Sequence, residues 1–434
     1  MPDLDRLQLL WNRLHQTLWW RPAIWSAGAV AVAFVSALAD QWIPLDWLPK
    51  VRNEVVEDLL NLMASSMLVV STFALSVLAS AYASAASAGT PRARRLVVAE
   101  PQSQKSVAVF LAAFIFSIVG VVALGVSDYG PAGYMVLFAS SLAVLAWVVV
   151  SFMLYIDVLS RIGQVAHTIA IVEGAAWKAL HDHARYPLSG ARAVQGPPEG
   201  ATPVHATKTG HVQFVDVEKL QSLAEEHGMQ VHVAARSGDL VHPSAAVAWL
   251  KLDAAKAEVT MDTALINAVR DAFLVGPERT IEQDAGYGLI VLAEIAQRAL
   301  SPAVNDPGTA IAVLGSQTRL LIRTLATAPD PHAPVCDRVT ALPAPLSPLV
   351  AIAFEPVARF CMEHFDVLYQ LVRHLEALVQ NAPPEVANEA LAVVQRAVER
   401  AERADVDAVD LARWREEAER LARLVAKSNE GAHP

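Results

Sequence analysis

The side chains best suited to chemistry lie between residues 276 and 310, where cationic, acidic and amide groups recur at short spacings. Five of them form the candidate site: Arg279, Asp284, Arg298, Asn305 and Asp306. Guanidinium groups beside the start of a helix favour an anion, because backbone N–H groups and arginine both donate to carboxylate or phosphate oxygens. If the neighbouring helices fold back on each other, the five could converge on a small ligand or ion. The alternative is a buried network that fixes two loops and a helix start.

The elements around these side chains follow from proline and aspartate signals. Asp306 precedes Pro307, which predicts a helix start with an aspartate N-cap. Ser301 followed by Pro302 predicts the end of the preceding helix. Asp284 and Arg298 then share a face of that helix, but they are fourteen residues apart and cannot touch directly.

Chemistry of other kinds finds little support. The 276–310 segment holds no nucleophile beside a base, so we predict no catalytic residues and no enzyme activity. The best metal ligands are Cys361, His364 and His374, whose spacings fit one helix face only loosely. We therefore expect no metal site and no cofactor.

A second set of polar side chains lies within the uncharged segment that runs from Asp58 to Arg92. At about 100° per residue, five small polar side chains fall on one face of a helix. They are Asn61, Ser65, Thr72, Ser76 and Ser80. Such a stripe serves either close helix packing or the lining of a polar path through an oligomer. No charge lies in the stripe, which argues against ion transport.

Apolar segments in residues 1–160 predict a helical membrane bundle. A bilayer core needs about 20 apolar residues in helical form, since backbone groups cannot stay unpaired in hydrocarbon. About four segments qualify, at residues 22–39, 62–86, 106–127 and 135–156. The same bundle must position the polar face of the second segment.

Lysine and arginine in the short loops predict the orientation of the bundle. The N-terminal segment holds three arginines, and the loop between the second and third segments holds three arginines and Lys105. The first loop is mainly acidic, and the third has no basic residue. The positive-inside rule places both termini in the cytoplasm of a multi-pass inner-membrane protein.

The rest of the chain predicts a cytoplasmic α+β region. Residues 161–206 should form a helical extension and a linker, because 186–206 are rich in glycine, proline and alanine. Residues 207–255 alternate like strands around a short helix and predict a small β-containing domain. Residues 256–434 predict a mostly helical domain.

Several motifs of the chain resemble a family of bacterial predicted membrane proteins, the domain of unknown function 2254. The motifs are a serine-rich second helix ending in Pro-Arg, Gly210-x-Val212-x-x-x-Asp216, Gly238-Asp-x-Val241, an Arg-Thr…Gln-Asp stretch, and Arg-Ala-Leu-Ser-Pro-x-x-Asn-Asp-Pro at residues 298–307. The last is the most specific, and the resemblance covers most of the chain. The end of the second helix is richer in alanine than the family pattern. The resemblance implies a membrane location and a two-part layout, and no activity.

The net charge of the chain limits the classes of molecule that it can bind. The net charge of −10 excludes a general nucleic-acid-binding surface, which is basic. The expected partners are the lipid bilayer, further copies of the chain and an unidentified small ligand. Two functions remain open. One is an oligomeric pore or transport protein with a cytoplasmic regulatory region, and the other is a membrane-anchored sensor or scaffold that binds a small anion or a partner protein.

Overall fold

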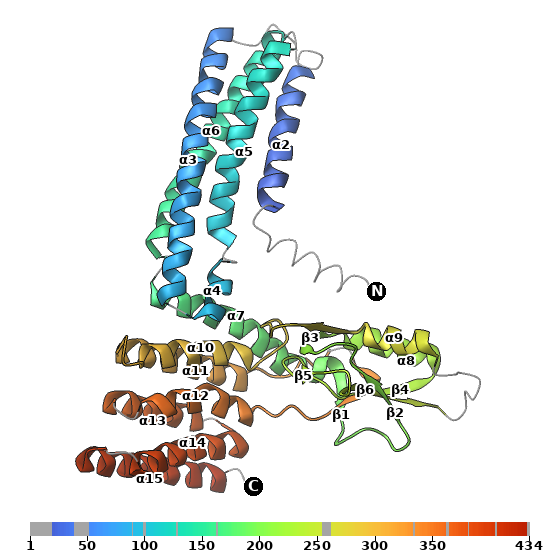
Figure 1. Cartoon of the computed structure of the whole chain (residues 1–434), viewed down its shortest axis with the longest axis vertical. Helices are drawn as coiled ribbons and strands as arrows, with labels where there is room; N and C mark the ends of the chain where they lie inside the picture. The colour runs from blue at the N-terminus through green and yellow to red at the C-terminus, as the bar shows by residue number, and fades with distance from the viewer. Residues whose placement is uncertain are drawn as a thin grey trace. The chain divides into compact units, whose positions relative to one another are not determined.

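The computed structural model of the protein describes most of the chain as two compact units (Figure 1). The first unit holds residues up to Ala88 and Arg94–His167, and the second holds residues 89–93 and everything from Thr168 onward. The described residues are 20–38, 52–88, 90–98, 101–126, 129–161, 164–253, 262–332, 335–361, 364–380, 382–403 and 406–431.

The first unit is a helical bundle centred on one helix. Its long helices are α2 (Trp20–Leu38), α3 (Asn53–Ala88), α5 (Pro101–Val126) and α6 (Pro131–Arg161). Helix α5 packs against α2, α3 and α6. Three helical segments are long and apolar enough to cross a membrane: Asn53–Ser80, Lys105–Val126 and Pro131–Arg161.

The predicted spans at 62–86, 106–127 and 135–156 are confirmed as long apolar helices. The span predicted at 22–39 falls on α2, whose apolar stretch Ala23–Val32 is shorter than a span. The last residue of the predicted span, Ala39, lies outside the described residues. The count of four spans therefore stays a prediction, and three are found among the described residues.

Small residues let the helices of the bundle approach closely. Gly120 of α5 faces Leu60 of α3, and a Cβ at Gly120 would lie 3.0 Å from the Leu60 Cδ1 atom. The hydroxyl of Tyr155, on α6, donates to the carbonyl of Ala74 on α3. Phe110 of α5 stacks edge-on against the Tyr155 ring. Close contacts of this kind stabilise helix pairs where the hydrophobic effect between helices is weak.

Two further helices lie outside the spans, one between the first and second spans and one after the third. Helix α4 (Pro91–Val98) begins after Thr90, whose hydroxyl accepts from the Ala93 N–H at 3.2 Å. Helix α7 (Val165–Arg185) follows α6.

The second unit contains two sheets. Their strands are β1 (Ala191–Ala193), β2 (Thr202–His205), β3 (Gly210–Val215), β4 (Met229–Val233), β5 (Leu240–Val241), β6 (Ala246–Leu252), β7 (Phe273–Gly276) and β8 (Cys336–Ala341). One sheet has the order β1-β8-β4-β6-β2 and the other has the order β5-β3-β7. Leu220, Met229 and Leu250 are fully buried in their common core.

Aspartate caps start both helices of this β region. The Asp216 carboxylate accepts from Lys219 N at 2.9 Å and starts α8 (Val217–His227). Asp262 does the same for Leu265 at 2.8 Å and starts α9 (Thr263–Arg270). Each cap satisfies a backbone donor that the first helical turn leaves unpaired.

The β region is larger than residues 207–255. Strands β1 and β2 come from residues 186–206, which the composition predicted as a linker, and β7 and β8 come from the predicted helical domain. Strand β8 lies between β1 and β4 and is parallel to both. The prolines of residues 329–348 predict a loop there. The strand β8 is missed because parallel partners far apart in sequence leave no local signal.

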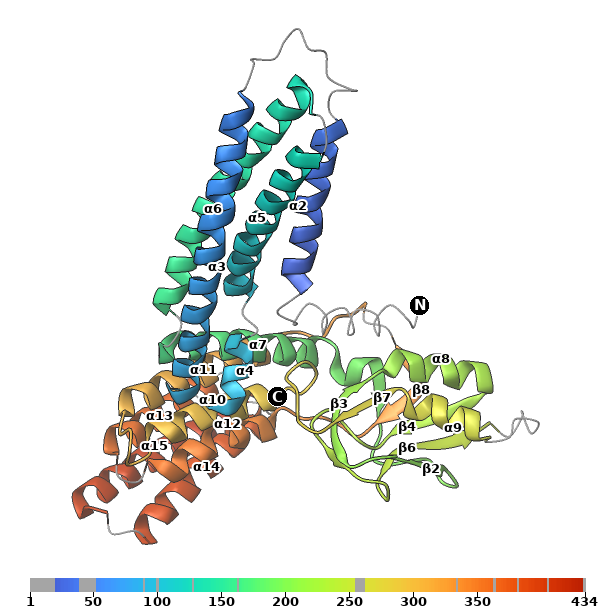
Figure 2. The same cartoon turned by 45° about the horizontal axis from the view of Figure 1, so that its top comes forward.

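Three stacked helical hairpins complete the second unit (Figure 2). The helices are α10 (Tyr287–Ala299), α11 (Pro307–Leu325), α12 (Ser347–Phe360), α13 (Phe365–Val379), α14 (Pro384–Arg403) and α15 (Ala408–Gly431). Helix α12 packs between α10 and α14, and α13 packs between α11 and α15. The pattern of residues 350–380 predicts one helix there. This prediction is wrong, because α12 and α13 are separate helices that each bury an apolar face against other helices.

Candidate functional site

Arg279 and Asp284 form a partly buried ion pair before α10. The Arg279 Nε atom lies 2.8 Å from Asp284 Oδ2, and one Nη lies 2.6 Å from the same oxygen. The Asp284 side chain is only 5% exposed. Its other oxygen accepts from the N–H groups of Gly286 and Tyr287 at 3.2 and 3.0 Å. One carboxylate thus holds an arginine and the start of a helix.

The turn between β4 and β5 closes over this carboxylate. Gly238 has φ +96°, which favours glycine, and a Cβ there would lie 2.4 Å from Asp284 Oδ2. The Gly238 carbonyl lies 3.1 Å from His211 Nδ1 on β3. The glycine of the Gly-Asp-x-Val motif therefore has a physical role, since only a residue without a side chain fits against Asp284.

Burial and charge act in opposite directions on Asp284. Burial raises the pKa of its carboxyl above the ordinary value, and the Arg279 guanidinium opposes that shift. Arg279 also lies over the Tyr287 ring, 5.3 Å from its centre. Because the charge of Arg279 is paired with Asp284, the arrangement suits a structural connection between the β region and α10.

Two glutamine side chains extend this connection along β3. Gln283 accepts from Val215 N at 2.9 Å and donates to Val215 O at 3.1 Å, as a neighbouring strand would. Gln213 donates to the Glu278 carbonyl at 2.7 Å. Neither glutamine was singled out from the sequence as a site residue, although Gln283 precedes Asp284 in a motif of the resemblance.

The other three predicted residues lie at the opposite end of α10. Asp306 caps α11, accepting from the Thr309 N–H at 3.1 Å and from its hydroxyl at 2.6 Å. These hydrogen bonds lower the pKa of the Asp306 carboxyl. Asn305 takes a left-handed conformation with φ 49°, and the exposed Arg298 ends the last turn of α10.

The structure therefore places the five residues in two groups rather than around one ligand. Helix α10 has 13 residues, which at 1.5 Å per residue separates its ends by about 18 Å. The expected convergence of all five side chains is wrong for this reason. Ligand binding at either group stays a prediction.

The chain enters the second unit through residues 89–93 and through helix α7, and both segments contact α10 or α11. Arg92 forms an ion pair with Glu294 of α10. Glu173 of α7 receives Arg319 of α11 in a bidentate pair, with N–O distances of 3.0 and 2.7 Å. The Arg323 guanidinium lies 3.7 Å from the centre of the Trp177 ring.

A glycine allows the contact between α7 and α10. A Cβ at Gly288 would lie 2.4 Å from the Ala176 Cβ, so the two helices meet almost backbone to backbone. The sequence contained the arginines and acids of these pairs but offered no spacing that would join them.

The polar stripe of α3 faces outward in the first unit. All five of its residues are exposed. The buried residues of α3 in the spanning segment include Leu60, Met63, Met67, Ala74 and Leu78. At about 100° per residue these lie on the opposite side of the helix from the stripe. The stripe does not pack within its own bundle.

Three hydroxyls of the stripe bond to their own helix. Ser65 donates to the Asn61 carbonyl at 2.9 Å, Thr72 donates to Leu68 at 3.0 Å, and Ser76 donates to Thr72 at 2.9 Å. Each hydroxyl proton is thus used, and the oxygen lone pairs remain free to accept.

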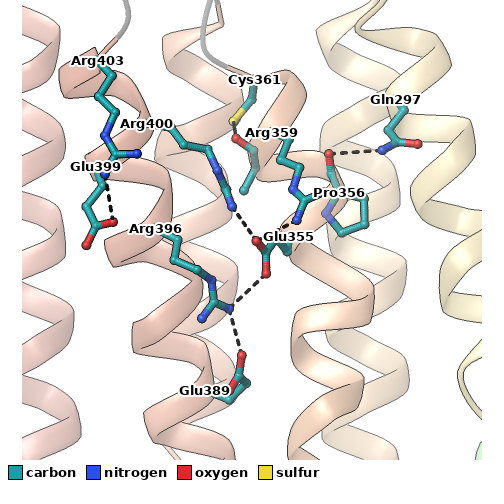
Figure 3. A network of polar contacts seen from close by, with 11 residues as sticks. Gln297, Glu355, Pro356, Arg359, Cys361, Glu389, Arg396, Glu399, Arg400 and Arg403 are labelled. Atoms are coloured by element: carbon teal, nitrogen blue, oxygen red, sulfur yellow. Dashed lines mark hydrogen bonds and ion pairs between the residues drawn. The ribbon is translucent and has the colours of Figure 1, made fainter.

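A network of arginines around Glu355 joins α12 to α14 (Figure 3). Arg359, Arg396 and Arg400 all reach the Glu355 carboxylate, which is 16% exposed. Burial alone raises the pKa of this carboxyl, but the arginine hydrogen bonds bring it below its ordinary value. The many charged residues of the last two helices predict a solvated face, whereas the stacking of α12 on α14 places Arg396 and Arg400 at an interface.

The weak metal candidates do not assemble into a cluster. The Cys361 thiol is fully buried and donates to the Ala358 carbonyl at 3.5 Å. Burial raises its pKa to about 12. Among the residues with assigned structure, no three His, Cys, Asp or Glu side chains could hold a metal ion together.

Comparison with known proteins gives a family and no activity. Residues 15–377 match the family described as "Predicted membrane protein (DUF2254)". An uncharacterized protein of Mycobacterium bovis and one of Mycobacterium tuberculosis are each 34% identical over 118 residues, which cover 27% of this chain and 22% of each relative. No solved structure matches. The chain belongs to the family of predicted membrane proteins of the domain of unknown function 2254.

Proposed function

We propose that the protein is an inner-membrane homo-oligomer whose α3 helices meet and line a narrow polar path. The outward orientation of the α3 stripe carries this proposal. The five polar side chains are exposed on the face opposite the buried side of α3, within a segment long enough to cross a membrane.

Polar side chains that face hydrocarbon lack hydrogen-bond partners, which supports a second copy of the chain as the surface that covers the stripe. Lipid tails offer no hydrogen bonds. A side-chain amide such as that of Asn61 has more N–H donors than the carbonyls of its own helix can pair. Small side chains also let two helices approach closely enough for packing to stabilise the pair. Stripes that meet around an axis would present hydroxyl oxygens to water or to a cation.

Cysteine cross-linking in native membranes tests the contact between copies. Thr72→Cys and Ser76→Cys should form disulfide-linked dimers under mild oxidation. Leu75→Cys is the matched control, because Leu75 is 57% exposed on the flank of the same helix. Both native cysteines are buried and should add little background. Equal cross-linking at positions 75 and 76, or none at 72 and 76, would refute the contact.

Flux into liposomes tests the path separately from the contact. The reconstituted protein should pass small cations or polar solutes, and Ser76→Leu should reduce the flux while cross-linking through Thr72→Cys persists. Flux that stays at the background of protein-free liposomes would refute the path and leave the oligomer intact. Labelling from each side should find both termini in the cytoplasm.

A second candidate is a sensing or scaffolding role for the second unit. The observation in its favour is that Arg92, which follows α3 in sequence, pairs with Glu294 of α10. If the second unit reports to α3, Arg92→Ala and Glu294→Ala should each change Ser76→Cys cross-linking. Arg161→Ala, which removes an exposed arginine from the end of α6, is the control. Unchanged cross-linking in the first two variants would remove this support.

A further inference from the structure

We propose that α4 and the start of α5 form a binding surface for the headgroups of anionic phospholipids. The surface consists of Arg94 and Arg95 on α4 together with Lys105 on α5. It does not depend on oligomer formation or on a path through the membrane, so it goes beyond the function proposed above.

Helix α4 presents its cations from a fixed helix rather than a loose loop. Ala93 and Val97 are buried, at 0% and 1% exposed, whereas Arg94 and Arg95 are exposed. The Thr90 hydroxyl caps the start of the helix. Because one face of the helix is anchored, the direction of its cations is set before any lipid arrives, which lowers the entropic cost of binding.

The charge of this segment is one-sided. Residues 89–105 contain four basic side chains, Arg92, Arg94, Arg95 and Lys105, against the single acid Glu100. Arg92 is paired with Glu294. The whole chain has a net charge of −10, so the excess of positive charge is local to this segment and not a property of the whole protein.

The position of the segment in the chain confines it to the membrane surface. It lies between the candidate spans Asn53–Ser80 and Lys105–Val126. Helix α3 continues to Ala88, eight residues past the first of these spans and therefore roughly 12 Å along its axis. The headgroup layer adds only about 5–8 Å outside the hydrocarbon core. Lys105 is the first residue of the next candidate span, and long arginine and lysine side chains can extend toward the headgroup layer.

Lipid phosphate is the partner that matches this geometry. Basic clusters next to a span bind anionic lipids with a free energy that adds for each charge and falls with salt. Guanidinium groups also donate in pairs to phosphate oxygens. A diffusing anion would gain no advantage from the position of Lys105 at the first residue of a span, whereas a headgroup anchored in the bilayer would.

Electron spin resonance of spin-labelled lipids in proteoliposomes tests the proposal. The full-length protein should select spin-labelled phosphatidylglycerol over phosphatidylcholine, and 0.5 M salt should weaken the selection. Removing two charges in Arg94→Gln/Lys105→Gln should lower the relative association constant at least fivefold. Each single variant should lie between the double variant and the wild type, which guards against a folding defect in the double variant.

A matched variant distinguishes a local surface from overall charge. Lys208→Gln/Lys251→Gln removes the same two charges from exposed positions in the β region and should leave the selection unchanged. Equal loss in both double variants, or no lipid preference in the wild type, would overturn the proposal. Displacement of phosphatidylglycerol by inorganic phosphate at constant ionic strength would also overturn it, because that result indicates a site for free anions.

Discussion

The polar groups of the α3 stripe and those of the second unit find their partners in different ways. On α3, Ser65, Thr72 and Ser76 donate to carbonyls of their own helix and face outward. In the second unit, Asp284 and Glu355 join separate elements and are largely buried. A polar group satisfied within one helix leaves its surface available for a partner. A polar group satisfied between elements holds the fold together and has little left for a ligand.

This contrast predicts where a polar side chain matters for stability. Loss of a buried partner leaves a charge without compensation, which costs several kcal/mol. Loss of a hydroxyl that bonds to its own helix costs little. Four measurements follow, in order of decreasing expected effect.

Asp284→Ala should lower the free energy of unfolding of the second unit the most. It leaves Arg279 unpaired and removes the acceptor of the Gly286 and Tyr287 N–H groups at the start of α10. A loss of about 3 kcal/mol is expected once the partial exposure of Arg279 is allowed for. Chemical denaturation in detergent measures the change. Glu282→Ala, at an exposed neighbouring position, is the control and should stay within about 0.5 kcal/mol. Equal losses in the two variants would break the comparison.

Glu355→Gln should have the next largest effect. Three arginines then share a neutral amide, and the contact between α12 and α14 should weaken by about 2 kcal/mol. The same substitution at Glu399, whose pair with Arg403 is 4.0 Å long and exposed, should change the free energy of unfolding by less than about 0.5 kcal/mol. Hydrogen exchange would localise the loss to α12 and α14. Uniform exchange across the unit would contradict the assignment.

Acid should destabilise the second unit through His232. This side chain is 2% exposed on β4, its Nδ1 atom lies 2.9 Å from the Thr340 hydroxyl, and burial lowers its pKa. The unfolded chain then binds a proton that the folded chain resists, so stability is complete above the ordinary pKa of about 6.5 and falls as the pH drops below it. Denaturation at pH 7.5 and 5.5 should show the loss, and His232→Gln should reduce it. An unchanged pH dependence in His232→Gln would exclude this residue as the cause.

Ser76→Ala should have the smallest effect. Its hydroxyl bonds to Thr72 on the same helix, so the free energy of unfolding in detergent should change by about 0.5 kcal/mol or less. Thermal unfolding in detergent measures this change. Ser117→Ala is the counterpart, because Ser117 is fully buried in α5 and also bonds within its helix. A large loss at Ser76 would show that the stripe supports its own bundle.

Local patterns predicted a large part of the fold. Apolar length located the three spans, and Asp306 with Pro307 located the start of α11, because caps and hydropathy act within a few residues. The site was predictable only in part. Arg279 and Asp284 are close in sequence and meet in space, whereas Arg298, Asn305 and Asp306 are separated from them by the rigid length of α10.

The amino-acid sequence by itself determined the membrane bundle, the helical character of the C-terminal region and the polar face of α3, since each depends on periodicity or on neighbouring residues. Tertiary structure alone decided that β8 enters the sheet, that the 350–380 segment reverses, and that Gly238 closes over Asp284. It also decided that the α3 stripe faces away from its own bundle. The physical reason is that these outcomes depend on which distant surfaces bury each other, and short spacings along a chain do not encode that choice.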